Sequence, residues 1–207
     1  MALASYVDLQ TAVAEWAARG DTTVTGRIPD FIRLGEERIW ETGEHVVRNE
    51  LWGLSTPTAL VVPAGFNYVA LPSDWLGFSR VRSATETRIE YMPPDQLEDL
   101  PSPGQANAYS VEGGRFVYGQ TPSADLSLTV RYFKHPGLLA TVGTTWLFAR
   151  APSVYLYASL LEAALFVKNS AKVAEWGALL DKALSGLDSA SRAAQFSGGR
   201  LRVQGRF

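Results

Sequence analysis

The sequence predicts an α+β fold: a helical bundle from N- and C-terminal helices, with an inserted antiparallel β region and a flexible C-terminal arm. Apolar residues near both ends of the chain recur at three- and four-residue steps, which is the period of a helix. Between these regions the apolar runs are short, alternate with polar residues and are interrupted by proline and glycine, as in strands and turns. We therefore expect N-terminal helices in residues 1–50, the β insertion in 51–142, a helical hairpin in 143–196 and the arm in 197–207.

The first helix is predicted to begin after Ser5, because Ser5 and Asp8 have the spacing of a capping box, and to end at Gly20. Its apolar stripe consists of Leu9, Val13 and Trp16. The segment that follows, residues 21–26 (DTTVTG), is predicted to be a loop.

The second helix is predicted to begin around Pro29 and Asp30, since proline suits the first turn and an acidic side chain is favoured at the positive end of the helix dipole. Its apolar stripe consists of Ile28, Ile32, Gly35, Ile39 and Val46. The glycine in this stripe predicts the close approach of another helix. The opposite, solvated face is predicted to carry Arg33, Glu36, Glu37, Arg38 and Glu41, with Arg33 and Glu37 spaced as an ion pair.

The β insertion is predicted to open with a hairpin of residues 56–62 and 67–71 around the turn at residues 63–65. Further strands are expected in residues 78–84, 87–92 and 125–133, and one helical turn in residues 94–100. Gly113 and Gly114 lie between two short apolar runs, so they predict a tight hairpin turn with positive φ angles.

The C-terminal helices begin with the most continuous apolar segment of the chain, residues 154–167. A helix that is apolar on all sides is typical of the middle of a domain. A second helix follows a short polar connector, so the two should form an antiparallel hairpin. Its apolar stripe consists of Val173, Trp176, Leu180, Leu184, Leu187 and Ala194.

The composition argues against several functional classes. A formal net charge of −2 and a pI near 5.7 are unlike those of a dedicated nucleic-acid-binding protein, and the absence of cysteine excludes disulfides and thiol nucleophiles. His45 and His135 lack metal-ligand spacing, and the carboxylates of the second helix are interleaved with arginines. We therefore expect no catalytic residues, no metal and no cofactor. The longest apolar run is shorter than the roughly 20 residues of a membrane span, and no secretory signal is visible, so we expect a soluble chain with no membrane partner.

The C-terminal sequence from Phe196 to the end (FSGGRLRVQGRF) contains three arginines and no acidic residue. It admits three interpretations: a solubilising end without a partner, a nucleic-acid arm, or a docking peptide. Alternation of apolar and polar side chains suits an extended segment that adds to a partner's edge or groove. The residues alone leave these interpretations open.

An ordered set of segments resembles one known family. The segments are SYVDLQTAVAEWAARGD, RIPDFIRLGEERI, YVALPSDWLGFSRVR, IEYMPPDQLEDL, AYSVEGGRFVYG, LTVRYF and TTWLFARAPSVYLYASLLEAALFVKN. Together, and in this order, they resemble the head-to-tail adaptors (head completion, or tail-tubular A type) of tailed bacteriophages. The resemblance covers nearly the whole chain.

This resemblance implies a structural protein of the virion neck, made in the host bacterial cytoplasm. It would form a homo-oligomeric ring, with twelve-fold symmetry expected, that connects the portal protein to a tail or nozzle protein and surrounds packaged DNA without sequence-specific binding. The C-terminal arm would reach the portal through Arg200, Leu201, Arg202, Val203 and Phe207.

Two other functional classes compete with the adaptor. Aromatic and acidic residues could indicate a small carbohydrate-binding or hydrolase-like β module, although the sequence contains no nucleophile–base pattern. The basic C-terminal tail could indicate a nucleic-acid-binding accessory protein, whose affinity would fall steeply with salt.

Overall fold

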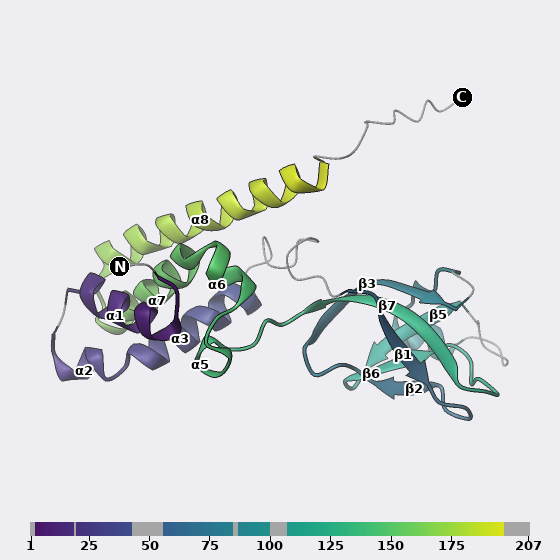
Figure 1. Ribbon diagram of the computed structural model, residues 1–207. Helices are drawn as coiled ribbons and strands as arrows, with labels where there is room; N and C mark the ends of the chain where they lie inside the picture. Colours follow the sequence, from purple (N-terminus) through teal and green to yellow (C-terminus); the bar gives the residue numbers. More distant parts are fainter. Residues whose placement is uncertain (1–2, 19, 43–55, 85–86, 100–106, 197–207) are drawn as a thin grey trace. The chain divides into compact units, whose positions relative to one another are not determined.

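A computed structural model describes residues 3–18, 20–42, 56–84, 87–99 and 107–196 of the chain (Figure 1). The chain divides into two compact units, and each is described by itself. The first, here called the helical unit, consists of residues 1–52 and 136–207, and the second, the β unit, consists of residues 53–135. Both helices and β-sheets are present, so the predicted α+β class is confirmed. The finer four-part division stays a prediction.

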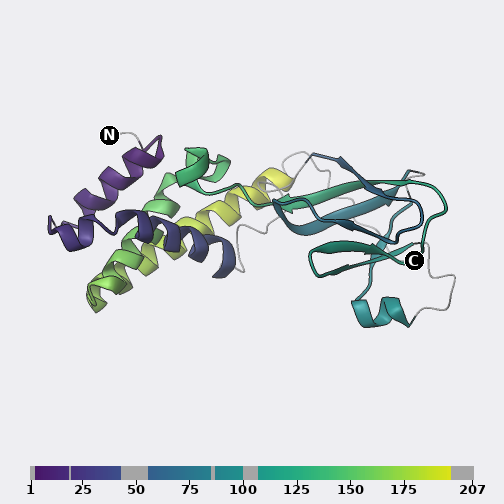
Figure 2. The same cartoon turned by 90° about the horizontal axis from the view of Figure 1, so that it is seen from below.

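The helical unit is organised around α7, which lies between α3 and α8 (Figures 1 and 2). Its helices are α1 (Tyr6–Trp16), α2 (Thr22–Thr25), α3 (Ile28–Glu37) with a π-helical extension (Arg38–Thr42), α5 (Leu139–Val142), α6 (Trp146–Arg150), α7 (Pro152–Phe166) and α8 (Ser170–Phe196). Nine of the fifteen residues of α7 are buried, so the prediction of a central core helix is confirmed. Its buried hydroxyl, Ser159 Oγ, donates to the Tyr155 carbonyl at 2.7 Å and is thereby satisfied inside the helix.

Close packing between α3 and α7 requires a residue without a side chain on α3. A Cβ atom added to Gly35 would lie 3.0 Å from the Ser159 nitrogen and 3.1 Å from the Ala158 carbonyl carbon. Both of these are backbone atoms of the buried helix, so the predicted close approach is confirmed. An ion pair between Arg38, in the π-helical turn after α3, and Glu162 of α7 also connects the two helices.

The N-terminal helices confirm some expectations and correct others. The capping box is present, because the Asp8 N–H donates to Ser5 Oγ at 3.2 Å and the Ser5 N–H donates to the Asp8 carboxylate at 3.0 Å. However, α1 ends at Trp16 rather than Gly20, and Ala18 takes a positive φ of 51°. The segment predicted as a loop contains a short helix, α2, because the Asp21 carboxylate caps it at the Val24 N–H. The end of the predicted second helix, including Val46, lies outside the described residues.

The β unit consists of two sheets with a common core. The strands are β1 (Thr58–Val62), β2 (Tyr68–Ala70), β3 (Trp75–Ser83), β4 (Glu90–Tyr91), β5 (Ala108–Glu112), β6 (Arg115–Tyr118) and β7 (Leu126–Lys134), and α4 (Pro94–Glu98) follows β4. One sheet has the order β1-β7-β3 and the other the order β2-β6-β5-β4. The shared core consists of residues from both sheets, namely Leu60, Val62, Val81, Ile89, Tyr109, Phe116, Tyr118, Leu128, Val130 and Tyr132.

The predicted strands exist, but one predicted pairing is wrong. Strands β1 and β2 do not form a hairpin with each other, because β1 pairs with β7 and β2 pairs with β6, so the turn at Gly65 connects two sheets. The region is also not wholly antiparallel, since β4 and β5 pair in parallel. The hairpin of β5 and β6 is confirmed, with φ angles of 53° at Gly113 and 74° at Gly114.

Candidate interaction surfaces

The predicted portal-binding residues lie beyond the part of the chain that the structure describes. Helix α8 ends at Phe196, and Arg200, Leu201, Arg202, Val203 and Phe207 all follow it. Their placement and their role therefore stay predictions. Candidate contact surfaces among the described residues are found on each of the two units.

A cluster of three aromatic rings lies on the helical unit. Trp16 from α1 contacts Tyr157 from α7 and Trp176 from α8, with ring centroids 6.5 and 6.0 Å apart, and Tyr157 stacks on Trp176 at 6.1 Å. The Lys172 ammonium lies 5.3 Å from the centroid of Trp176. Trp176 is buried, but Trp16 keeps 50% of its surface exposed. Sequence periodicity assigned Trp16 to the apolar stripe of the first helix and did not predict that half of its surface is exposed.

A pocket of about 220 Å³ adjoins this cluster. It is lined by Trp16, Ala17, Ala18, Val24, Leu160, Ala163, Ala164, Val167, Asn169, Lys172 and Trp176. The early end of α1 and the positive φ of Ala18 turn the chain away at this point, which leaves the tryptophan ring at the pocket's margin. Apolar walls with one ammonium group suit an apolar side chain of a partner protein.

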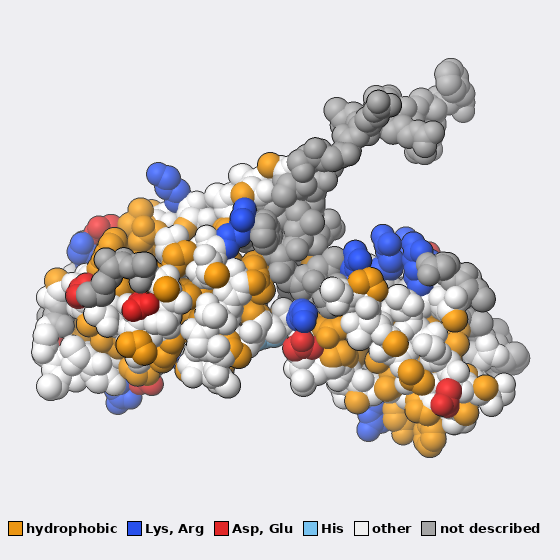
Figure 3. Space-filling view, viewed as in Figure 1, with side chains coloured by type: hydrophobic (Ala, Val, Ile, Leu, Met, Phe, Trp, Pro, Cys, Tyr) orange, Lys and Arg blue, Asp and Glu red, His pale blue; other side chains and the backbone are white. Residues whose placement is uncertain are grey.

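Further apolar side chains of the helical unit are exposed, and Figure 3 shows such side chains gathered on the face of this unit seen in Figure 1. Phe166, at the end of α7, is 48% exposed, although its ring contacts Phe31 with a centroid distance of 5.3 Å. Leu34 and Leu165 are exposed on the same two helices. Grouped exposed apolar side chains are typical of protein–protein contact surfaces.

The β unit carries a pocket of about 550 Å³ between α4 and the outer face of the sheet β2-β6-β5-β4. Its aromatic wall is Tyr68, whose ring faces the Arg115 guanidinium at 4.7 Å and the Phe66 ring at 5.8 Å. Glu98 and Glu112 also line it. The Ser110 hydroxyl is buried at this pocket and makes no hydrogen bond to any described residue. A buried hydroxyl without a hydrogen-bond partner is unfavourable.

The solvated acidic face predicted for the second helix is wrong at Glu36. This side chain is 2% exposed and accepts a hydrogen bond from the Leu139 N–H at 2.8 Å. Burial raises the pKa of Glu36, while the hydrogen bond from Leu139 and the charge of Arg33 oppose that shift. Glu36 therefore connects α3 to the first turn of α5. The neighbouring Arg33–Glu37 ion pair, at 3.2 Å, is exposed as predicted.

A tryptophan near the end of a segment can belong either to a contact surface or to the core. Trp40 is buried in the core of the helical unit and contacts Trp146 with a centroid distance of 6.5 Å, so it serves the core. Trp75 is half-buried and packs on Phe78 at 5.5 Å, and Trp52 lies outside the described residues. Periodicity could not separate these cases, because burial of a terminal aromatic depends on which segment covers it.

The described residues contain no group of three or more His, Cys, Asp or Glu side chains that could hold a metal ion. No helix in the same part of the chain has the length and apolar character needed to cross a membrane.

The sequence matches the family described as SU10 adaptor protein over residues 4–204. The chain belongs to this family. It is a family of phage head-to-tail adaptors, so the resemblance inferred from the ordered segments is confirmed. A comparison with curated proteins finds no match. The matched range includes both units of this SU10 adaptor family member and most of the predicted arm.

Proposed function

We propose that the chain is a structural, non-catalytic protein of the virion neck, forming a ring that connects the capsid's portal protein to the tail. The observation that carries this proposal is the family match over residues 4–204, nearly the full length of the chain. We expect twelve-fold symmetry for the ring. The protein would be made in the host bacterial cytoplasm and would surround packaged DNA without reading its sequence.

The surfaces of the two units support this role. A ring of identical subunits is built from heterologous contacts, so each copy must carry two different complementary surfaces. The helical unit carries exposed apolar side chains around Trp16 and Phe166, and the β unit carries a separate pocket around Tyr68. These surfaces differ in chemistry, since one is apolar with a single ammonium group and the other contains two carboxylates and an arginine.

The partners follow from the proposed position in the virion. The arm, through Arg200, Leu201, Arg202, Val203 and Phe207, would contact the portal. Helix α8 is 27 residues long, or about 40 Å at 1.5 Å per residue, so its length allows it to carry the arm well away from its first turn. A tail or nozzle protein would bind the opposite end of the ring.

Truncation separates the arm from the rest of the adaptor. A chain ending at Phe196 should keep the helical circular-dichroism signal and thermal midpoint of the full-length protein, because the deleted residues follow the last described helix. It should bind purified portal more weakly in a sedimentation or pull-down assay. A variant with Arg200, Arg202 and Arg206 replaced by serine keeps the length of the arm and removes its arginines, so it separates the effect of charge from the effect of length. Equal portal binding by the truncated, substituted and full-length proteins would refute the role of the arm.

A further inference from the structure

Four arginines gather on one side of the β unit. In the sheet β1-β7-β3, Val81 and Val130 point into the core, so their neighbours Arg80, Arg82 and Arg131 point to the outer face. Arg88 lies opposite Arg82 across an isolated antiparallel bridge and therefore shares that face. We call these four residues the arginine face. Figure 3 shows basic side chains gathered along one edge of the β unit.

Arginines lie directly opposite arginines on this face. Arg80 is the direct cross-strand partner of Arg131, and Arg82 is the direct partner of Arg88. Like charges in directly opposite positions of a sheet are destabilising. Within the described part of the chain, no carboxylate lies within ion-pair distance of Arg80, Arg88 or Arg131. The remaining outward positions between them include the hydroxyl residues Ser127 and Thr129, both exposed. The Arg80–Arg131 pair, with Arg88 exposed on the same face, indicates a surface that an acidic partner would stabilise.

The opposite outer face of the same unit is partly covered by an acidic helix. Helix α4 covers part of the outer face of the second sheet, because its residues Leu97 and Glu98 line one pocket with Ser110 of β5. Asp95 and Glu98 of this helix and its C-cap residue Asp99 are all exposed, and none of them forms an ion pair with a described residue. We call these three residues the acidic segment.

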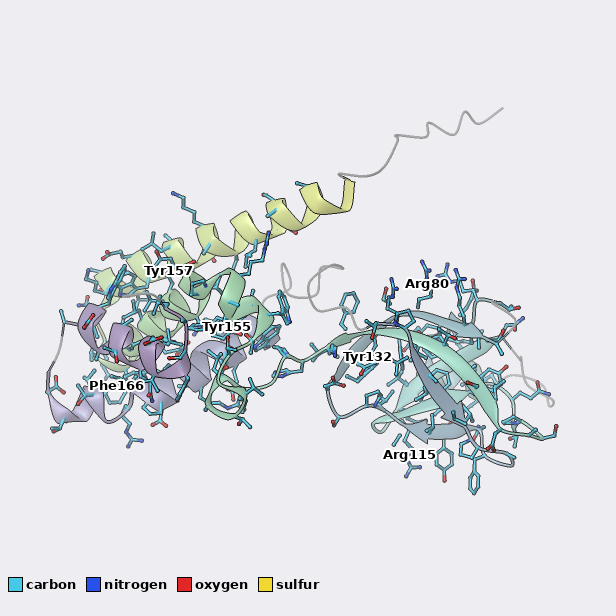
Figure 4. The ribbon with its side chains drawn as sticks, in the orientation of Figure 1. Arg80, Arg115, Tyr132, Tyr155, Tyr157 and Phe166 are labelled. Atoms are coloured by element: carbon cyan, nitrogen blue, oxygen red, sulfur yellow. The ribbon has the colours of Figure 1, made fainter. Side chains whose placement is uncertain are left out.

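The two charged surfaces lie on opposite sides of one folded unit. The sheets pack through a common core, in which Phe78 of β3 contacts Tyr109 and Phe116 of the other sheet at 5.6 and 5.7 Å. The outer faces therefore point in opposite directions, and Figure 4 shows Arg80 and Arg115, one from each sheet, on opposite sides of the unit. Complementary surfaces on opposite sides of one subunit generate a heterologous contact that repeats from copy to copy.

We propose that the arginine face of one copy binds the acidic segment of the next copy, so that the β units form a charged subunit interface. This inference rests on the proposed ring and names the contact that orders its β units. The partner is a second copy rather than nucleic acid for two reasons. The β unit contains eight acidic and six basic residues, so its overall charge repels a polyanion. The complementary acidic surface is also present on the same unit, in the orientation that a repeating contact requires.

Charge reversal tests the contact directly. The variant R80E/R131E should raise the protein concentration needed for half-maximal ring assembly on purified portal by about tenfold or more, since it places acids against acids. D95R/E98R should have the same effect, because it places arginines against arginines. The chain carrying all four substitutions should assemble at close to the wild-type concentration, because it exchanges the two charges and restores complementarity.

A matched control separates this contact from a general effect of charge. R27E/R33E changes the net charge by the same amount, but both arginines lie on or next to α3 of the helical unit, where each forms an exposed ion pair. It should assemble like the wild type. Far-UV circular dichroism and the thermal midpoint of each variant establish that it is folded. If the wild type and R80E/R131E form rings at the same concentration, the inference is refuted while the ring itself stands.

Cysteine cross-linking supplies a second readout, because the natural chain contains no cysteine. Thr129 is exposed beside the arginine face and Gln96 is exposed on α4. After mild oxidation of rings assembled from a mixture of T129C and Q96C chains, we expect disulfide-linked dimers of one chain of each kind. Rings that form without such dimers would refute the interface. If the wild type forms no ring at all, the proposed function itself fails.

Duplex DNA provides the competing outcome. The inference predicts that R80E/R131E and the wild type show the same weak retardation of duplex DNA in a gel at low salt. Salt-dependent DNA binding that is lost in R80E/R131E, together with unchanged ring assembly, would assign the arginine face to nucleic acid and overturn the subunit contact.

Discussion

The close approach of α3 and α7 predicts that Gly35 cannot be replaced by alanine without loss of stability. In the interior of a helix, glycine to alanine ordinarily gains about 1 kcal/mol, because alanine loses less backbone entropy on folding. At Gly35, however, the new methyl group would lie 3.0 Å from the Ser159 nitrogen and 3.1 Å from the Ala158 carbonyl carbon. These are backbone atoms of the buried helix α7, which cannot rotate away as a flexible side chain would.

The expected magnitude is the difference between these two effects. Overpacking a core typically costs about 1–3 kcal/mol, so the gain in helix propensity offsets only part of the loss. We expect G35A to lower the free energy of unfolding by about 1 kcal/mol. For a chain of this length that corresponds to a fall in Tm of about 2–4 °C. G35V should cost more, because a branched side chain adds a second clash and gives back most of the propensity gain.

Gly177 supplies the matched control. It lies within α8, and a Cβ atom added there would meet no atom within 4 Å. G177A should therefore raise the free energy of unfolding by about 0.5–1 kcal/mol, the ordinary result for an open helical glycine. Urea denaturation of the full chain, followed by circular dichroism at the helical minimum, measures both variants. If G35A stabilises the protein as much as G177A does, the close packing of α3 on α7 is wrong.

Two further predictions concern polar groups of the helical unit. Burial raises the pKa of Glu36, so the native state holds its proton to higher pH than the unfolded chain, and stability falls as pH rises through the native pKa. E36Q keeps an oxygen acceptor for the Leu139 N–H but cannot ionise. In urea titrations, the wild type should therefore lose stability relative to E36Q as pH rises from acid to neutral. A difference in unfolding free energy that does not change with pH would contradict the buried ionisation. S5A removes the acceptor for the Asp8 N–H and should cost about 1 kcal/mol, measured by the shift of the urea midpoint, and an unchanged midpoint would show that the capping box contributes nothing.

Local chemistry made much of the fold predictable from the sequence. The capping box at Ser5 and the double-glycine turn at Gly113 each depend on a few adjacent residues, and both are present. The central position of α7 could be predicted because a helix without a polar face must be covered on all sides. The close approach at Gly35 was predicted for a similar reason, since an apolar stripe containing glycine leaves space for a neighbouring backbone.

The errors concern partners that are distant in sequence. The hairpin predicted for β1 and β2 failed because β1 pairs with β7, whose residues follow more than 60 positions later, and alternation does not identify a partner strand. Glu36 was assigned to the solvent because its sequence neighbours are charged, whereas its hydrogen-bond partner, Leu139, is 103 residues away. The exposed position of Trp16 depends on the early end of α1, and the boundary of a helix is weakly specified by sequence.

The arginine face shows the same limit in the candidate surfaces. Arg80 and Arg82 are visible in the sequence as alternate residues of a strand, but Arg131 and Arg88 join them only through strand register and an isolated bridge. The overall charge of −2 does not indicate that basic and acidic residues lie on opposite sides of one unit. The residues predicted for the portal contact, Arg200 to Phe207, came from the resemblance alone and stay predictions.

Imaging the protein on its portal tests the proposed adaptor role most directly. Purified portal and the full-length chain are mixed under assembly conditions, and the product is examined by single-particle electron cryomicroscopy. The adaptor role predicts a closed ring of additional density on one end of the portal, with the symmetry of the ring read from the averaged images. Portal particles that stay bare at saturating concentrations of folded protein would contradict it.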